Sequence, residues 1–81
     1  MQITVMLFAT LKDQAGTQRV PVEIEPGASV RELKSLLGRR YPALEPHLGS
    51  VLVAINSEYA FGEDSLQEGA EVALFPPVSG G

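Results

Sequence analysis

The sequence has no cysteine, no tryptophan and a single histidine among its 81 residues. Without thiols it cannot form a disulfide, a cysteine-ligated zinc site or an iron–sulfur cluster, and one imidazole supplies no histidine cluster. No apolar run approaches the ~20 residues that a membrane-spanning helix needs. Residues 1–4 carry no positively charged side chain, so we expect no signal peptide. These absences favour a small cytoplasmic protein with no bound metal and no membrane partner.

Basic residues are scarce and unevenly placed. Six lysines and arginines stand against ten acids, and the formal net charge is −4. All six bases precede residue 56, whereas the acids of residues 56–81 are Glu58, Glu63, Asp64, Glu68 and Glu71. No basic stripe is available to neutralise phosphates, so we expect no nucleic-acid binding. The acidic third is either a solvated face or a surface that fits a basic partner.

The residue patterns of an autonomous enzyme are missing as well. With His47 as the only imidazole and no cysteine, the chain offers neither a convincing Ser-His-Asp triad nor a thiol nucleophile. The acids lack the spacing of a calcium loop, and the glycines form neither a P-loop nor a dinucleotide-binding loop. We therefore expect no catalysis by this chain alone and no bound cofactor.

The chain does contain strand-like alternation around one amphipathic helix. Ile3, Val5, Leu7 and Ala9 repeat with period two, which predicts a strand with one face on a core. Further along, Ser29 and Glu32 form a capping box. The predicted elements are strands over 2–9 and 19–25 with one or two helical turns between them, a helix over about 29–40, a loop over 42–50, a strand covered on both faces over 51–55, a short segment over 59–61 and a strand over 71–75.

This order predicts a two-layer α+β domain over residues 1–75, in which a mixed sheet of four to five strands packs on one main helix. The last strand is expected in the centre of the sheet, as in the β-grasp arrangement. Pro21 has no N–H to donate, so we expect the second strand either at an edge of the sheet or with the N–H position of Pro21 facing solvent.

Six residues, 76–81, follow the last predicted strand and end in two glycines. Pro76 and Pro77 are stiff and favour an extended exit from the sheet. Gly80 and Gly81 place no side chain beside the terminal carboxylate, which suits passage through a narrow channel in another protein. We interpret 76–81 as a flexible tail that presents Gly81. The alternative is an ordinary frayed end.

Aromatic residues near the tail are candidates for a docking surface. Phe75 alternates out of phase with Val72 and Leu74, so it faces the other side of the sheet. Together with Met6 and Phe8 it would form an apolar patch on the side of the sheet away from the helix, where a partner protein could bind. The alternative is that these aromatics are core residues, the commoner place for aromatics in strands.

Three stretches resemble the small, sulfur-carrier subunits of molybdopterin synthase: residues 5–16, 53–59 and 66–81. The most specific part is the closing pattern Gly-x-Glu-Val-Ala-x-Phe-Pro-Pro-Val-Ser-Gly-Gly, which ends at Gly81. The resemblance spans essentially the whole chain and implies a ubiquitin-like β-grasp fold. Thiamin-pathway sulfur carriers and ubiquitin-like modifiers share that fold and the terminal Gly-Gly, so those two features alone do not separate the classes.

The resemblance implies a carrier chemistry at Gly81. An E1-like enzyme would use ATP to adenylate its carboxylate, and a sulfur donor protein would displace AMP to leave a thiocarboxylate. The tail would then enter the large subunit of a heterotetrameric synthase and pass its sulfur to a cyclic pyranopterin precursor, building the dithiolene of molybdopterin. The implied roles are reaction for Gly81, channel clearance for Gly80, passage of the tail for Val78 and Ser79, exit direction for Pro76 and Pro77, and docking for Phe75 with Phe8 and Met6.

Three alternatives remain open from the sequence. A ubiquitin-like modifier would pass the activated Gly81 to a lysine amine, and a sulfur carrier of another pathway, such as thiamin synthesis or tRNA thiolation, would pass the sulfur to a different acceptor. A binding module with an inert tail is the third possibility. Only Lys12 and Lys34 are available for self-linked chains, which weakly disfavours a polymerising modifier.

Overall fold

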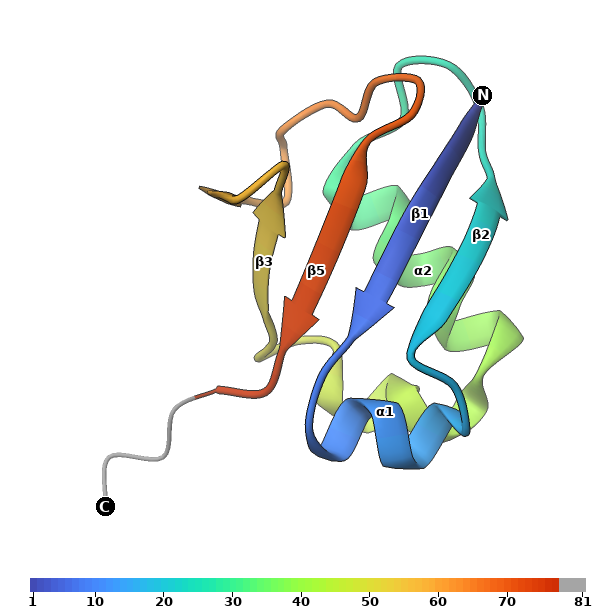
Figure 1. The fold of residues 1–81 in the computed structure, drawn as a ribbon, viewed down its shortest axis with the longest axis vertical. Helices are drawn as coiled ribbons and strands as arrows, with labels where there is room; N and C mark the ends of the chain where they lie inside the picture. Colours follow the sequence, from blue (N-terminus) through green and yellow to red (C-terminus); the bar gives the residue numbers. More distant parts are fainter. Residues whose placement is uncertain (78–81) are drawn as a thin grey trace.

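Five strands and two α-helices make up most of residues 1–77, the part of the chain that this computed structural model describes (Figure 1). None of the helices in this part is long and apolar enough to cross a membrane. The elements are β1 (Gln2–Leu7), α1 (Thr10–Ala15), β2 (Arg19–Glu23), α2 (Val30–Arg40), the 3-10 helix η1 (Pro42–His47), β3 (Leu52–Ile55), β4 (Glu58–Ala60) and β5 (Glu71–Phe75).

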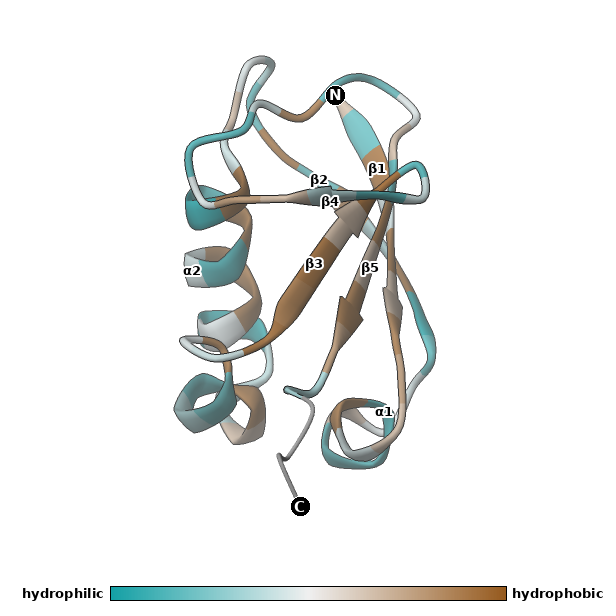
Figure 2. Ribbon diagram, turned by 90° about the vertical axis from the view of Figure 1, so that its left-hand side faces the viewer, coloured by the Kyte–Doolittle hydropathy of each residue, from teal (hydrophilic) through white to brown (hydrophobic). Residues whose placement is uncertain are grey.

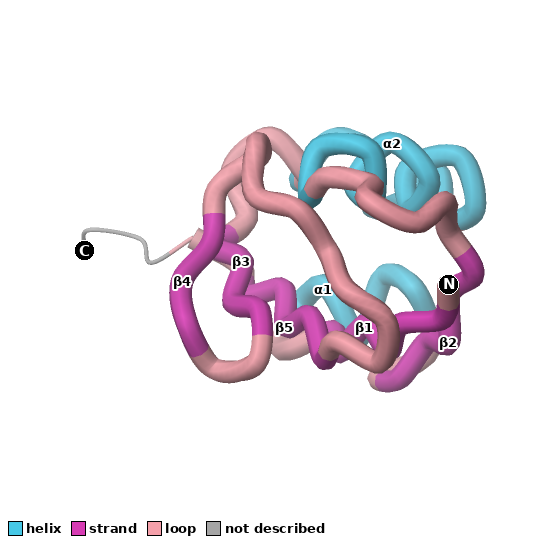
Figure 3. The backbone as a smooth tube through the Cα atoms, turned by 90° about the horizontal axis from the view of Figure 1, so that it is seen from above, coloured by secondary structure: helices cyan, strands magenta, loops and turns pink. Residues whose placement is uncertain are grey.

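The strands form one mixed sheet in the order β2-β1-β5-β3-β4. The first and last strands, β1 and β5, pair in parallel, and all other pairs are antiparallel. The main helix α2 lies across one face of this sheet, as the view from above shows (Figure 3). The predicted α+β class, the β-grasp arrangement and the central position of the last strand are all confirmed.

The core fills the space between the sheet and α2. Alternate residues of β1 (Ile3, Val5 and Leu7) are at most 1% exposed, and Leu33 and Leu37 of α2 are fully buried against them. Within residues 1–77 no polar or charged residue is buried. Figure 2 shows the same division: α2 is hydrophilic on its outer side and hydrophobic toward the sheet. Burial of this apolar surface is the main force that holds the fold together.

The predicted capping box of α2 is present. The Oγ of Ser29 accepts a hydrogen bond from the backbone N–H of Glu32 at 3.2 Å, and Oε1 of Glu32 accepts one from the N–H of Ser29 at 3.3 Å. Two N–H groups that the first helical turn leaves without partners are thereby satisfied. At the other end Tyr41 is extended (φ −128°, ψ 83°), as expected for a residue before proline.

Several boundaries differ from the prediction. The first strand ends at Leu7, because Ala9 turns the chain with φ 53° and Leu11 N–H donates to Phe8 O at 3.1 Å. Ala9 is therefore exposed, not on the inward face. The second strand stops at Glu23. The segment predicted as a loop over 42–50 contains η1, whose Pro42 starts a helical turn in the way favoured for proline at N1.

The prediction that the third strand is covered on both faces is wrong. In β3, Val53 is 4% exposed toward the core, but Leu52 is 38% exposed on the other side. Within residues 1–77, α2 lies on one face of the sheet and no helix lies over the opposite face of β3 (Figure 3). An apolar strand beside an uncovered face gives the same sequence pattern as a doubly buried one.

Both edges of the sheet are poor templates for a further strand. β2 is an edge strand, as one of the two predicted alternatives had it, and its Pro21 has no N–H; Nη1 of Arg40 donates to Pro21 O at 3.2 Å. At the other edge β4 has three residues, and the N–H of Phe61 just beyond it donates to Oδ2 of Asp64 at 2.7 Å. Short strands and edge proline are common ways to prevent strand addition.

Candidate functional site

The face of the sheet opposite α2 carries the predicted docking residues. Because successive strand residues point to opposite faces, Met6 lies between the buried Val5 and Leu7, and Phe75 follows the buried Leu74. Met6 and Phe75 are half-buried, as is Phe8 just beyond β1. The structure therefore brings the three residues to one outer face and not into the core beneath α2.

Phe8 and Phe75 stack on each other. Their ring centroids are 4.8 Å apart and the rings are inclined by 10°. Phe8 N–H donates to Leu74 O at 3.3 Å, which extends the β1–β5 pairing by one residue and holds the two rings side by side. Stacked aromatic pairs contribute about 0.5–1.5 kcal/mol beyond the area they bury. The stack thus forms an apolar platform at the end of β5.

The platform is part of a hollow on the face of the sheet opposite α2. Its centre is apolar, with Ala54 and Ala73 between the aromatics, and its rim is polar. The lining residues are Met6, Phe8, Ala54, Ser57, Tyr59, Glu71, Ala73 and Phe75. We call these eight residues the outer face. An apolar centre with a polar rim is the usual anatomy of a protein–protein interface.

Tyr59, which sequence reasoning missed, is the most exposed aromatic of this surface, at 74%. A two-residue turn at Asn56 and Ser57, both with positive φ (48° and 73°), connects β3 to β4. These angles are those of a type I′ turn, which sets Tyr59 opposite Ala54. The available signal was Asn56 between two apolar segments, but serine stands where glycine usually marks this turn.

Charged side chains flank the hollow on one side. Nη2 of Arg19 lies 3.9 Å from Oε2 of Glu71 and donates to Sδ of Met6 at 3.6 Å. Both charged side chains are more than half exposed, so this ion pair stabilises the fold little. Glu71 is the one acid of the predicted acidic third that lies in the outer face. Within residues 1–77 no three metal-ligating side chains gather.

The tail leaves the sheet directly beside the platform. Pro76 is half-buried and Pro77 exposed, immediately after Phe75 in the central strand β5. Val78, Ser79, Gly80 and Gly81, the remaining residues predicted for the tail, lie outside the described residues. The structure therefore places the base of the tail next to the outer face, and the role of Gly81 stays a prediction.

Known proteins match this chain over essentially its whole length. The model of the ThiS family matches residues 5–81. The molybdopterin synthase sulfur carrier subunit of Chlamydomonas reinhardtii is 36% identical, with 100% of each chain covered. Small archaeal modifier protein 1 of Haloferax volcanii is 36% identical over 93% of this chain and 95% of its own.

Solved structures show the same fold. The crystal structure of SAMP1 from Haloferax volcanii superposes with a TM-score of 0.90 at 34% identity and covers 100% of both chains. A structure titled as the complex of subunits 1 and 2 of the molybdopterin-converting factor from Helicobacter pylori has a TM-score of 0.71, with 100% of both chains covered. At 23% identity that second likeness supports the fold alone.

Proposed function

The chain belongs to the ThiS family, and from this membership we propose that it is the sulfur carrier of molybdenum-cofactor biosynthesis, the small subunit of molybdopterin synthase. The observation that carries the proposal is the full-length match to a curated sulfur carrier subunit. The fold supports it, because the central strand delivers the base of the tail beside an apolar platform. We place this function in the cytoplasm, with no cofactor bound to the carrier.

The proposed chemistry activates the carboxylate of Gly81. A carboxylate is a poor acyl donor, so an E1-like enzyme first transfers AMP from ATP to it and releases pyrophosphate. The persulfide sulfur of a donor protein then attacks the acyl carbon and displaces AMP. A further thiol cleaves the resulting acyl disulfide, so that the donor leaves as a disulfide and a thiocarboxylate remains on Gly81. In the synthase that sulfur attacks the pyranopterin precursor, and water then cleaves the Gly81–sulfur bond, which leaves the sulfur on the pterin and restores the carboxylate. Each tail brings one sulfur, so two carriers complete one dithiolene.

The geometry of the tail's base suits this delivery. Six residues, 76–81, would span roughly 20 Å when extended, at ~3.3 Å per residue. Pro76 and Pro77 restrict the backbone where it leaves β5, which lowers the entropy lost when the tail enters a channel. The glycines Gly80 and Gly81 keep the reacting end narrow.

We assign docking on the large subunit to the outer face, and we expect Phe75→Ala to weaken that binding by about 2 kcal/mol or more, since aromatic anchors dominate interface energies. Phe75 is half-buried and faces away from α2, so the free energy of unfolding should fall by only about 1 kcal/mol, the contribution of its stack on Phe8. Calorimetric titration with the large subunit and urea denaturation measure the two quantities. A large loss of stability with unchanged binding would mean that Phe75 acts as a core residue and not as a docking residue.

A second candidate function is protein modification, favoured by the similarity to small archaeal modifier protein 1. The two functions share the adenylate and differ in the nucleophile that follows. In the modifier a lysine amine captures the Gly81 acyl group, whereas in the carrier sulfur does.

Alkylation of the activated protein distinguishes the two. The chain has no cysteine, so iodoacetamide has no thiol side chain to modify. After incubation with the activating enzyme, ATP and a sulfur source, we expect one alkylated sulfur on the tryptic peptide 41–81. That peptide contains no methionine, so a sulfoxide of Met1 or Met6 cannot imitate the exchange of oxygen for sulfur. Isopeptide bonds to many lysines without alkylatable sulfur would support the modifier. If neither alkylated sulfur nor isopeptide bonds are found, the tail is inert.

A further inference from the structure

A second apolar hollow lies where the chain turns from β4 toward α2. The side chains that matter here are Lys34 of α2, Leu52 of β3, and Tyr59 and Phe61 on β4 and just beyond it. We call these four residues the β4 corner. Leu52, Tyr59 and Phe61 are 38%, 74% and 75% exposed, and they are the large hydrophobic side chains that the structure leaves exposed within residues 1–77. Their gathering at one corner is unusual for a surface without a partner.

Among residues 1–77, the one charged residue that lines this hollow is a cation, although the acids Glu63 and Asp64 follow directly on its lining residue Gly62. Lys34 lines the hollow, and within residues 1–77 it makes neither a salt bridge nor a side-chain hydrogen bond. Arg31 lies close by, because a Cβ placed on Gly62 would come within 3.6 Å of its Nη2. The nearby carboxylate of Asp64 accepts a hydrogen bond from Phe61 N–H. A protein of net charge −4 thus presents an apolar hollow beside two cations.

The β4 corner is continuous with the outer face. Tyr59 lines both hollows, and Leu52 is the register partner of Phe75 on the neighbouring strand. Figure 2 shows β4 crossing from the sheet toward α2, so the corner lies at the side of the sheet next to the outer face. One partner surface can therefore contact both hollows without a break.

We infer that the β4 corner is a second contact site for the large synthase subunit, which would place an apolar side chain against Phe61 and Leu52 and a carboxylate beside Lys34. This inference rests on the proposed function, since it assigns more surface to the same partner. The partner then wraps around the β4 edge instead of resting on the sheet face alone. The two cations make an acidic residue the fitting neighbour for the apolar anchor.

Calorimetric titration of purified carrier variants with the large subunit tests the inference. Phe61→Ala should raise Kd about tenfold, the effect of losing one aromatic anchor of roughly 1.4 kcal/mol. Because Phe61 is 75% exposed, the urea midpoint should not move. Lys34→Gln should raise Kd about threefold and make Kd less dependent on salt, as for the loss of a charge at an interface rim.

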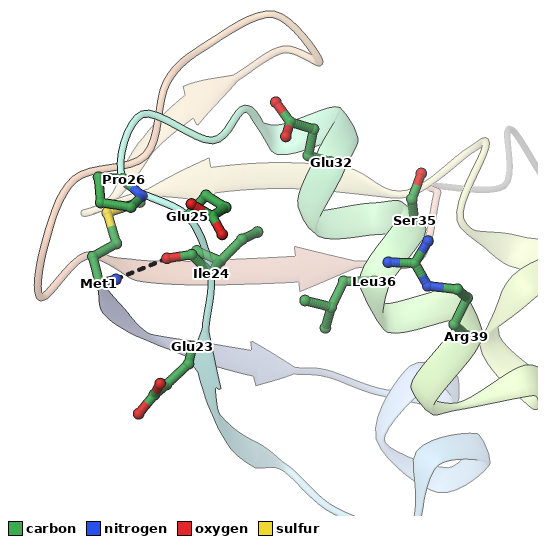
Figure 4. A pocket seen from close by; sticks show the side chains of 9 residues that line it. All are labelled: Met1, Glu23, Ile24, Glu25, Pro26, Glu32, Ser35, Leu36 and Arg39. Atoms are coloured by element: carbon green, nitrogen blue, oxygen red, sulfur yellow. Dashed lines mark hydrogen bonds between the residues drawn. The ribbon is translucent and has the colours of Figure 1, made fainter.

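Arg39→Gln is the matched control. It removes the same charge from the same helix, but Arg39 lines a different groove, between β2 and α2, together with Glu25 and Glu32 (Figure 4). Its affinity for the large subunit should equal that of the unaltered carrier. A weakening as large as that of Lys34→Gln would mean a general charge effect and would overturn the assignment of the carboxylate contact.

The remaining outcomes separate the inference from the proposed function. If Phe75→Ala weakens binding while Phe61→Ala and Lys34→Gln leave it unchanged, the proposed function stands and the β4 corner is not a contact. If the unaltered carrier does not bind the large subunit, both fall together. If Phe61→Ala also lowers the urea midpoint, its effect on Kd no longer separates binding from folding. The Kd of the Lys34→Gln variant then decides whether the β4 corner is a contact, since that change removes no buried side chain.

Discussion

Removal of Gly81 is expected to abolish sulfur transfer while leaving the unfolding transition where it is. The new terminal carboxylate, on Gly80, would lie ~3.3 Å short of the reacting position. A misplacement of about 1 Å can already cost 10²-fold in rate, so transfer should fall below about one hundredth. The residues of the apolar core lie between Ile3 and Leu74, and the deletion removes none of them. Dithiolene formation by the reconstituted synthase and a thermal melt measure the two effects.

An added glycine after Gly81 is the matched control for this experiment. It keeps every native residue and places the terminal carboxylate beyond the reacting position instead of short of it. Sulfur transfer should therefore be lost to the same extent. If the shortened protein still acquires alkylatable sulfur and supports dithiolene formation, then the position of the terminal carboxylate does not matter and the carrier mechanism is wrong.

Replacement of Leu33 by alanine is expected to have the largest effect on stability. Leu33 is fully buried between α2 and the sheet, and truncation of a buried leucine lowers the free energy of unfolding by about 2–5 kcal/mol. An 81-residue domain has a total stability of roughly 4–12 kcal/mol, so a large part is lost. Urea denaturation followed by circular dichroism measures the change.

Ser29→Ala provides the comparison on the same helix. It removes the hydroxyl that caps the N–H of Glu32 and should cost about 1 kcal/mol, because packing against the sheet is kept. Equal and negligible effects of the two changes would contradict the packing of α2 described above.

The bounds of α2 were predicted closely, because the residues that mark its two ends act on their near neighbours in the sequence. Ser29 and Glu32 are three residues apart and contact each other directly, and Pro42 acts on its neighbour Tyr41. The end of β1 has no such signal. Nothing in an alanine side chain indicates the positive φ of Ala9, which the turn between Phe8 and Leu11 imposes. Local chemistry predicts caps, whereas turns of this kind depend on the rest of the fold.

The positions of the site residues could be predicted where strand alternation alone decides which face of the sheet a residue lies on. The phase of Phe75 relative to Leu74 correctly placed it on the face away from α2. Its stacking on Phe8 depends on the parallel pairing of the first and last strands, which no local pattern reports. Tyr59 was missed for a related reason, because its position opposite Ala54 follows from the turn at Ser57.

The two protected edges of the sheet decide how partners can distinguish this protein from others of the same fold. A peptide that adds to a sheet edge binds mainly through main-chain hydrogen bonds, which every β-grasp protein could offer alike. Pro21 with Arg40 at one edge, and the three-residue β4 at the other, restrict that common mode. Partners must then recognise side chains on the face and corner, so cross-reaction between parallel pathways that use the same fold is limited by surface sequence.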